Sequence, residues 1–276
     1  MTAWRDCRSG LEAGPWLLDE QRNTIRLGAR QISVSTAERL GLLLRERPQA
    51  HLDLSGAPLE GRDKARAAAA LTGVLVQNGG LTALTVGSSR NKALWQASVP
   101  KILRANPQLQ ALTLHGEAWL SDCAGRLARI AGRQPTLQRL TLQGCSAATA
   151  TALLAALPTR RAGVSHLVLD AIGTKGCTSR FLASLIEELP KCRLRRLTLV
   201  GIKGFGRMRC ARLVDALHAA SCPTLLDLPQ AARSEVQFQQ YRVVAGAGPR
   251  AAGDVFAVEL AADGALRPVE HARRGQ

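Results

Sequence analysis

The sequence predicts an α/β solenoid, a stack of strand–helix units that share one parallel β-sheet. Three observations predict it: a short leucine pattern recurs along the chain, apolar residues between its copies have helical spacing, and prolines separate the predicted helices from the strands that follow. The chain has 276 residues, of which 46% are hydrophobic. That length and composition can bury a substantial core, so a wholly disordered chain is not expected.

The recurring pattern is L-x-x-L-x-L. Clear copies occupy residues 109–114, 137–142 and 194–199, copies with one Val lie at 81–86 and 164–169, and reduced copies lie at 25–27, 51–54 and 225–228. The last apolar residue of each copy recurs every 27 to 32 residues between Leu27 and Leu199. Residues two apart in a strand face the same side, so each copy predicts a short strand with one buried face. One such unit cannot bury its own apolar side, and stacked units can.

Between these copies the apolar residues follow helical spacing. The predicted stripes are Leu94, Trp95, Val99, Ile102 and Leu103; Leu153, Leu154 and Leu157; Phe181, Leu182, Leu185, Ile186 and Leu189; and Leu213, Val214 and Leu217. Residues 36–44 predict a further helix with Thr36 as its N-cap. Prolines are expected to end the helices before the next strands, at Pro48, Pro107, Pro135, Pro158, Pro190 and Pro223.

These units resemble the leucine-rich repeat, in its long form of about 28 residues with an outer helix, as in ribonuclease-inhibitor-like proteins. The resemblance covers residues 24 to 230 and implies a horseshoe of about eight repeats, with a concave parallel sheet and convex outer helices. The family often places Asn or Cys three residues after the last leucine, and only Cys145 does so here. The other positions hold Ala57, Ser89, Glu117, Ile172 and Ile202, so irregular turns are expected after the strands.

The two ends of the chain lack the repeat. Residues 1–23 contain Trp4 and Trp16 without a clear period, and they are expected to cap the solenoid of residues 24–232. Near the other end, residues 255–260 and 265–269 alternate like strands around Asp263 and Gly264, which predicts a hairpin. For residues 233–276 the sequence leaves two alternatives, a small β cap or a flexible tail.

The sequence contains no recognisable catalytic motif: there is no G-x-S-x-G, H-E-x-x-H, P-loop or Rossmann fingerprint. The glycine-rich residues 201–206 follow a predicted strand and are interpreted as an ordinary repeat loop. The seven cysteines are Cys7, Cys123, Cys145, Cys177, Cys192, Cys210 and Cys222. Their odd number and wide spacing favour reduced thiols over disulfides or zinc. Cys7 lies between Arg and Asp residues and is either a reactive thiol or a solvated terminal cysteine. We expect no enzyme, no metal and no cofactor.

The resemblance places function on the concave face of the sheet. Its central row is predicted to hold one residue per strand, namely Arg26, Asp53, Thr85, Thr113, Thr141, Val168 and Thr198. Flanking rows add His51, His115, Arg139, Gln143, His166, Asp170 and Arg196. The side chains of the central row are mostly small and uncharged, which favours a protein partner that lies along this row. The alternative is that its threonines reflect strand propensity alone.

The formal charge is +16, and Arg outnumbers Lys 31 to 6. Abundant Arg and Ala are typical of GC-rich bacterial genomes, so the charge alone indicates only salt-sensitive attraction to polyanions. Specific nucleic-acid recognition is not expected, because the concave row lacks the aromatic residues that stack on bases. The groups Arg126, Arg129 and Arg133, and Arg207, Arg209 and Arg212, are expected on a solvated convex face. No stretch approaches the roughly 18 apolar residues of a membrane span, and no Sec-type signal is recognised.

The expected function is a non-catalytic scaffold for protein–protein interaction. Similar Arg- and Ala-rich repeat proteins occur among virulence effectors of plant-associated bacteria. The resemblance therefore implies either a bacterial cytoplasmic protein or one delivered by type III secretion to act on a host protein. Three alternatives stay open: a substrate-selecting adaptor in ubiquitin transfer, a basic protein that binds polyanions or nucleic acid, and a housekeeping bacterial protein with an intracellular partner.

Overall fold

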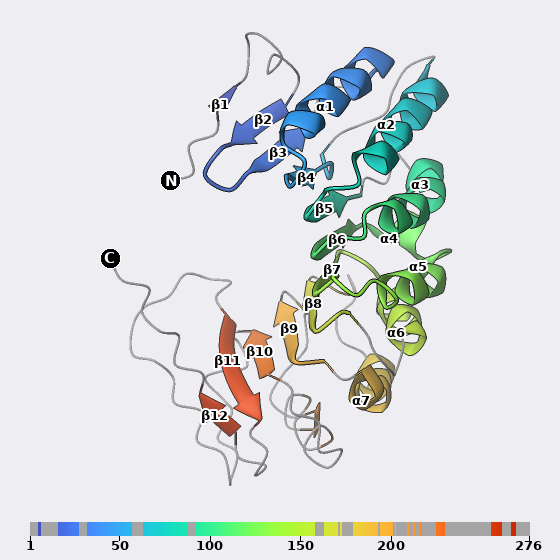
Figure 1. The fold of residues 1–276 in the computed structure, drawn as a ribbon. Coiled ribbons are helices and arrows are strands. Elements are labelled where there is room, and N and C mark those ends of the chain that lie inside the picture. Colours follow the sequence, from blue (N-terminus) through green and yellow to red (C-terminus); the bar gives the residue numbers. More distant parts are fainter. Residues whose placement is uncertain are drawn as a thin grey trace.

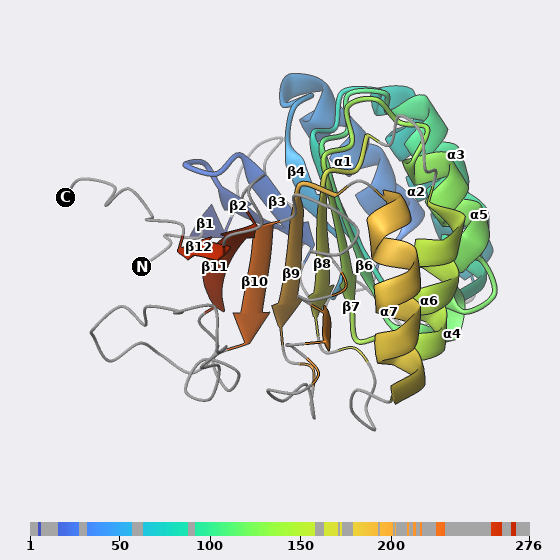
Figure 2. The ribbon, with the colours of Figure 1, turned by 90° about the horizontal axis from the view of Figure 1, so that it is seen from below.

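The computed structural model describes residues 5–6, 16–27, 32–56, 63–87, 92–157, 163–170, 172, 179–192, 194–200, 202, 209, 212–213, 216, 225–229, 255–260 and 266–268. Over these residues the chain follows an arc, with strands on its inner side and helices on its outer side (Figure 1). Seen from below, the strands and the helices form two separate layers (Figure 2).

The strands form a single sheet whose spatial order follows the chain. They are β1 (Arg5–Asp6), β2 (Trp16–Asp19), β3 (Thr24–Leu27), β4 (His51–Asp53), β5 (Ala83–Val86), β6 (Ala111–His115), β7 (Arg139–Gln143), β8 (His166–Asp170), β9 (Arg196–Val200), β10 (Leu225–Pro229), β11 (Val255–Leu260) and β12 (Leu266–Pro268). Every neighbouring pair from β3 to β10 is parallel. At the two ends, β1–β2–β3 and β10–β11–β12 pair antiparallel, and β11–β12 is where the sequence predicts a hairpin.

The helices alternate with the parallel strands. They are α1 (Val34–Glu46), α2 (Lys64–Asn78), α3 (Lys92–Ala105), α4 (Glu117–Leu120), α5 (Ala124–Ala131), α6 (Ala147–Ala156) and α7 (Ser179–Cys192). Successive outer helices pack side by side, α1 on α2, α2 on α3, α3 on α5, α5 on α6 and α6 on α7. The predicted α/β fold, a solenoid-like series of strand–helix units on a mostly parallel sheet, is therefore confirmed.

The core lies between the sheet and the helices, and the leucine pattern fills it. In β6 and β7 the leucines Leu112, Leu114, Leu140 and Leu142 are at most 1% exposed, and Trp95 of α3 is fully buried above them in the helix layer. Each such side chain contributes about 1.5–3 kcal/mol when it leaves water. The alternation of buried leucines with inner-face residues is the physical origin of the repeat.

Two predictions about helix ends are wrong. The N-cap of α1 is Ser33 and not Thr36, because Ser33 Oγ accepts the backbone N–H of Thr36 at 3.1 Å and the helix already starts at Val34. Pro190 lies inside α7, which continues to Cys192. A proline in the last turn removes only one intrahelical donor, so the helix can end two residues beyond it.

Other prolines do follow the helices as predicted. Pro48 and Pro107 come after α1 and α3, and Pro135 comes after α5. Pro158 and Pro223 lie outside the described residues, as do Trp4, Cys7, the loop 203–208 and most of the helix predicted around Leu213. Two of the positions where the family often has Asn or Cys hold buried apolar side chains, since Ile172 is 1% exposed and Ile202 is 5% exposed.

Candidate functional site

The inner face of the sheet carries the residues that the sequence assigns to a central row. Strand register places Arg26 opposite Asp53, then continues through one residue on each strand. The central row is Arg26, Asp53, Thr85, Thr113, Thr141, Val168 and Thr198. The pairing of Asp227 with Thr198 extends this row onto β10.

The flanking residues separate into two rows on either side of the central row. The first row, at the strand starts, is Thr24, His51, Ala83, Ala111, Arg139, His166 and Arg196. The last row, at the strand ends, is His115, Gln143, Asp170 and Val200. Every residue predicted for the concave face therefore lies on the inner face, but the two histidines His51 and His166 lie on the opposite edge from His115.

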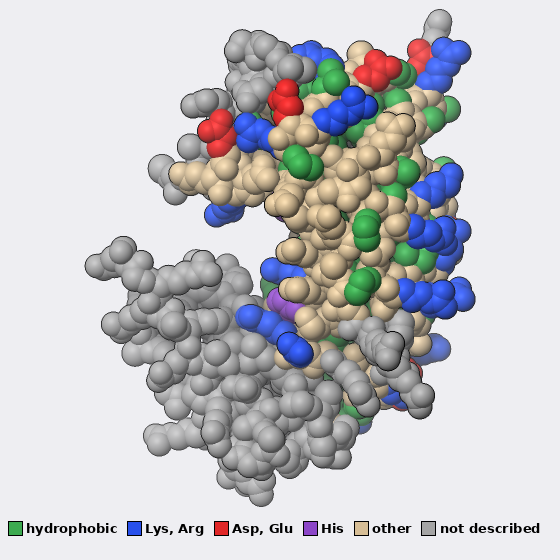
Figure 3. Space-filling model, in the orientation of Figure 1, with side chains coloured by type: hydrophobic (Ala, Val, Ile, Leu, Met, Phe, Trp, Pro, Cys, Tyr) green, Lys and Arg blue, Asp and Glu red, His purple; other side chains and the backbone are tan. Residues whose placement is uncertain are grey.

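Two histidines cover part of the central row. His51 Nε2 lies 3.2 Å from Thr85 Oγ1 on the next strand, and His166 Nε2 lies 2.9 Å from Thr198 Oγ1 in the same diagonal relation. Thr85 and Thr198 are consequently only 8% and 7% exposed. A purple imidazole is visible on the inner surface of the arc in Figure 3. The central row is thus less open at these strands than the sequence predicts.

The central row is more open on β6 and β7, whereas Val168 on β8 is only 5% exposed. The first-row residues that precede Thr113 and Thr141 diagonally are Ala83 and Ala111, whose side chains are too short to cover them. Thr113 and Thr141 are half-exposed. We call Ala83, Ala111, Thr113 and Thr141 the middle window. It is a shallow, uncharged area between two imidazoles.

The β3–β4 end of the face holds a tight ionic cluster. Arg26 Nε donates to Asp53 Oδ2 at 2.7 Å, while Asp53 Oδ1 accepts the backbone N–H of Ser55 at 3.0 Å and its hydroxyl at 2.7 Å. Burial on its own would raise the pKa of Asp53, but the Ser55 hydrogen bonds and the Arg26 guanidinium outweigh it, so that pKa is lowered. The carboxylate is fixed and neutralised by its neighbours.

The imidazole of His51 is kept neutral by its surroundings. Burial lowers the pKa of His51 most, the Asp53 carboxylate opposes that shift, and the Arg26 guanidinium adds to it. At neutral pH the His51–Thr85 contact is therefore an uncharged hydrogen bond. This end of the face presents Arg26 as its exposed cation, with half of its side chain accessible.

At the other end of the face the acidic residue Asp170 is less well paired than Asp53. Asp170 is half-buried in the last row, and burial raises its pKa, against the smaller opposing effect of His115. Among the described residues no side chain forms an ion pair or hydrogen bond with the Asp170 carboxylate. Across the strands, Arg139 is exposed and Arg196 is half-exposed in the first row. The face is therefore basic at the strand starts and acidic at the strand end nearest Asp170.

Most of the arginines predicted on the outer face are exposed, whereas Arg209 is half-buried and Arg207 lies outside the described residues. Arg126, Arg129 and Arg133 are exposed, and Lys and Arg side chains follow the outer helices in Figure 3. Arg126 donates to the carbonyl oxygen of Gln96 and Arg129 to that of Gly125. These contacts hold the two guanidinium groups against backbone carbonyls rather than in a pocket.

The described cysteines are reduced and lie in the core. Cys123, Cys145 and Cys192 are free and buried, and burial raises the pKa of the Cys123 thiol. In the described part of the chain, no group of three or more His, Cys, Asp or Glu side chains is placed to hold a metal ion.

No described helix has both the length and the apolar character needed to span a bilayer.

No protein-family model matches the chain, and no curated protein matches it significantly. What the inner face can bind must therefore be inferred from its own geometry and charge.

Proposed function

We propose that the chain is a non-catalytic protein-binding scaffold built from leucine-rich repeats of the ribonuclease-inhibitor-like type, and that a protein partner binds its inner face. The observation that supports this proposal is the unbroken register from β3 to β9, which aligns one side chain per strand in the central row. Continuous sheet faces of this kind are the binding surfaces of solenoid proteins.

The chemistry of the face suits a polar protein surface. Thr113 and Thr141 offer half-exposed hydroxyls, Gln143 offers an amide, and Arg139 offers a guanidinium that can pair with a carboxylate. The His51 and His166 imidazoles bound this area on either side. A partner with backbone or hydroxyl groups over the middle window and an acidic group near Arg139 would satisfy these side chains.

The size of the face limits how the partner binds. Six strands from β4 to β9, spaced by about 4.8 Å, and five residues of about 3.3 Å each give an area of about 24 by 16 Å. A standard protein complex buries about 800 Å² on each partner, which is roughly twice this area. The partner must therefore also contact residues beyond the strand edges.

We propose further that the chain is a bacterial effector delivered by type III secretion and that its partner is a host protein. The Arg- and Ala-rich composition supports this, with 31 of 37 basic residues being Arg. Secretion can be compared in a bacterium with and without the type III apparatus, and with residues 1–25 deleted. Secretion that survives both losses would overturn this part of the proposal.

The binding proposal is tested by capture at physiological salt after nuclease treatment, followed by identification and purification of the captured protein. The inner-face variant is Thr113→Arg/Arg139→Glu/Arg196→Glu. Its matched control, Ala69→Arg/Arg126→Glu/Arg129→Glu, makes the same change in net charge at exposed positions on α2 and α5. Circular dichroism is used to check that both variants fold.

Loss of binding only in the inner-face variant supports the proposal. Equal binding by wild type and both variants overturns the assignment to the inner face. Loss in both variants, or loss on nuclease treatment alone, favours the second candidate, a polyanion-binding protein. The +16 charge is the observation that keeps this candidate open.

A further inference from the structure

A groove runs between α1 and α2 on the outer side of the arc, far from the inner face. It encloses about 540 Å³ and is lined along α1 by Glu38, Gly41, Leu42 and Arg45, and along α2 by residues that include Val74 and the polar Gln77. Figure 3 shows acidic, basic and apolar side chains close together over α1 and α2. Leu42 is 44% exposed, which is unusual for a large apolar side chain in the described part of this chain.

The four α1 residues form one stripe of the helix. Positions 38, 41, 42 and 45 are related by steps of three and four residues, so their side chains share one face. Glu38 and Arg45 lie seven residues apart, about 10 Å along the axis, and cannot bond to each other. Neither side chain has an ion-pair partner among the described residues. The stripe therefore carries an unpaired acid at one end, an unpaired base at the other, and an exposed leucine between them.

Gly41 lies beside this leucine, where α1 and α2 approach each other closely. A Cβ at Gly41 would lie 3.0 Å from Cγ2 of Val74, so the glycine makes room for the valine of α2. The exposed leucine, an apolar knob on α1, thus stands next to a groove lined by Gly41 and by Val74 of α2.

We propose that this stripe is a self-association surface, at which two copies of the chain place their α1 helices antiparallel about a two-fold axis. The midpoint between positions 38 and 45 falls between Gly41 and Leu42. In that arrangement Glu38 of each copy meets Arg45 of the other, and Leu42 of each copy enters the groove of the other beside Gly41. A two-fold contact requires a surface that is complementary to itself, and this order of acid, glycine, leucine and base is self-complementary.

The contact is small, which sets the strength of the dimer. One helix and the groove beside it bury less than the about 1,200 Å² that stable interfaces need, and the net charge of +16 makes two copies repel. The dimer is therefore weak and depends on concentration. The inner face stays free in it, so self-association and partner binding are independent.

The test is sedimentation equilibrium of the full chain at physiological salt, with wild type at concentrations up to about 100 µM. The expected mass rises from that of the 29.4 kDa monomer toward twice that value. Glu38→Arg and Arg45→Glu each turn two attractions into two repulsions, and each weakens association about tenfold. Glu38→Arg/Arg45→Glu restores the pairing with exchanged signs and returns association to the wild-type level, at the wild-type net charge.

Two further variants separate the stripe from general effects. Leu42→Asn leaves the charge unchanged and removes the exposed knob, so it weakens association without affecting the core. Arg129→Glu makes the same charge change as Arg45→Glu on α5 and leaves association unchanged. A wild-type chain that remains monomeric overturns the proposal. So does association insensitive to the single reversals, a double variant that stays monomeric, or an equal effect of Arg129→Glu.

Discussion

The side chain of Asn106 donates a hydrogen bond from Nδ2 to the carbonyl oxygen of Leu75, 2.9 Å away on the preceding helix. The same amide nitrogen donates to the carbonyl oxygen of Ile102, and Oδ1 accepts the backbone N–H of Leu81. Asn106 is fully buried. One side chain therefore contacts three backbone groups, from α2, α3 and the segment before β5. It satisfies the Leu75 carbonyl near the end of α2 and adds a second donor to the Ile102 carbonyl, which already accepts the backbone N–H of Asn106.

Neighbouring repeats contain the same contact. Asn78 Nδ2 donates to the carbonyl oxygen of Leu44, and Gln134 Nε2 donates to that of Leu103. In each case the donor lies at or just after the end of one helix and the acceptor lies in the last turns of the helix before it. The contacts form an amide ladder, Asn78, Asn106 and Gln134, that links α1, α2, α3 and α5.

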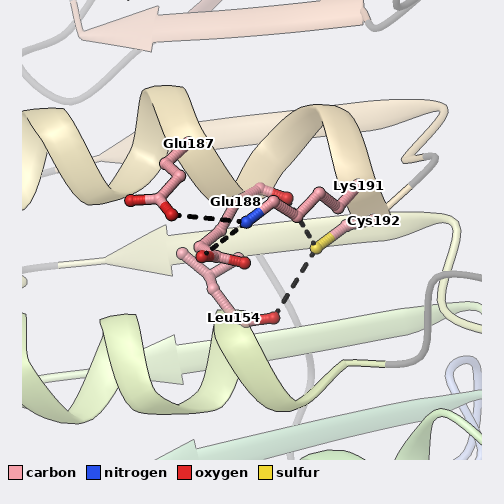
Figure 4. Close-up of polar contacts among 5 residues, drawn as sticks. All are labelled: Leu154, Glu187, Glu188, Lys191 and Cys192. Carbon is pink, nitrogen blue, oxygen red and sulfur yellow. Dashed lines mark hydrogen bonds and ion pairs between the residues drawn. The ribbon is translucent and has the colours of Figure 1, made fainter.

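At the α6–α7 pair the donor is a thiol. Cys192 Sγ lies 3.7 Å from the carbonyl oxygen of Leu154 and 3.2 Å from that of Glu188 (Figure 4). Beside it, Lys191 Nζ donates to Glu188 at 3.0 Å and to Glu187 at 3.5 Å on the exposed side of α7. A thiol is a weaker donor than an amide, so this helix pair is held less firmly by polar contacts.

We expect Asn106→Leu to destabilise the protein by about 2–4 kcal/mol, because it leaves buried donor and acceptor groups without partners. Urea denaturation measures the free energy of unfolding. Gln110→Leu, at an exposed position on the same connection to β6, is the control and changes that free energy by less than about 0.5 kcal/mol. Equal effects of the two substitutions would show that the ladder contributes no stability.

The amide ladder also marks a limit of the sequence-based prediction. Asn78, Asn106 and Gln134 follow one another at 28-residue steps, so the signal was present in the sequence. The leucine-rich-repeat pattern directs attention to the position three residues after the strand leucines, where apolar Ile172 and Ile202 stand. In this chain the polar links between repeats lie at the helix ends. They can be recognised only when the packing of each helix on its neighbour is known.

A second prediction concerns the turn after β5. Gly87 has φ +140°, and a Cβ there would lie 2.3 Å from the carbonyl oxygen of His115. Gly87→Ala therefore combines backbone strain with a backbone clash, and we expect it to cost about 3 kcal/mol or more. Gly116→Ala is the matched control, because Gly116 has φ +90° but open space around its Cβ position, and its cost is about 1 kcal/mol. Thermal unfolding of both variants measures the difference, and equal costs would contradict the clash.

A third prediction follows from the lowered pKa of His51. Because the folded protein holds this pKa below the usual 6.5, the unfolded chain binds the proton more readily, and the contribution of His51 to stability is lost as the pH falls below 6.5. We expect the free energy of unfolding to decrease more from pH 7.5 to pH 5.5 in wild type than in His51→Gln. His115→Gln is the comparison on the same face. A wild-type pH dependence that His51→Gln leaves unchanged would rule out burial of a neutral imidazole.

The rows of the inner face were predictable, but their exposure was not. The two-residue alternation of the leucine pattern assigns Thr113 and Thr141 to one row, and strand register confirms that assignment. Burial of Thr85 depends instead on a diagonal contact from His51 on the neighbouring strand. That contact joins residues 34 positions apart and requires the distance between strands, which periodicity does not contain. For the same reason the sequence does not reveal that Ala83 and Ala111 leave the middle window open.

The last prediction concerns a substitution that covers the middle window. Ala111 stands in the same diagonal relation to Thr141 as His51 does to Thr85 and His166 to Thr198. Ala111→His should therefore place an imidazole over Thr141, bury its hydroxyl, and leave the free energy of unfolding within about 0.5 kcal/mol of wild type. If a partner binds at the middle window, this variant reduces its affinity at least about tenfold. His166→Ala, which uncovers Thr198 two strands beyond Thr141, is the control and reduces it less. Titration of the purified partner measures both, and binding that is unchanged by Ala111→His would place the contact elsewhere on the face.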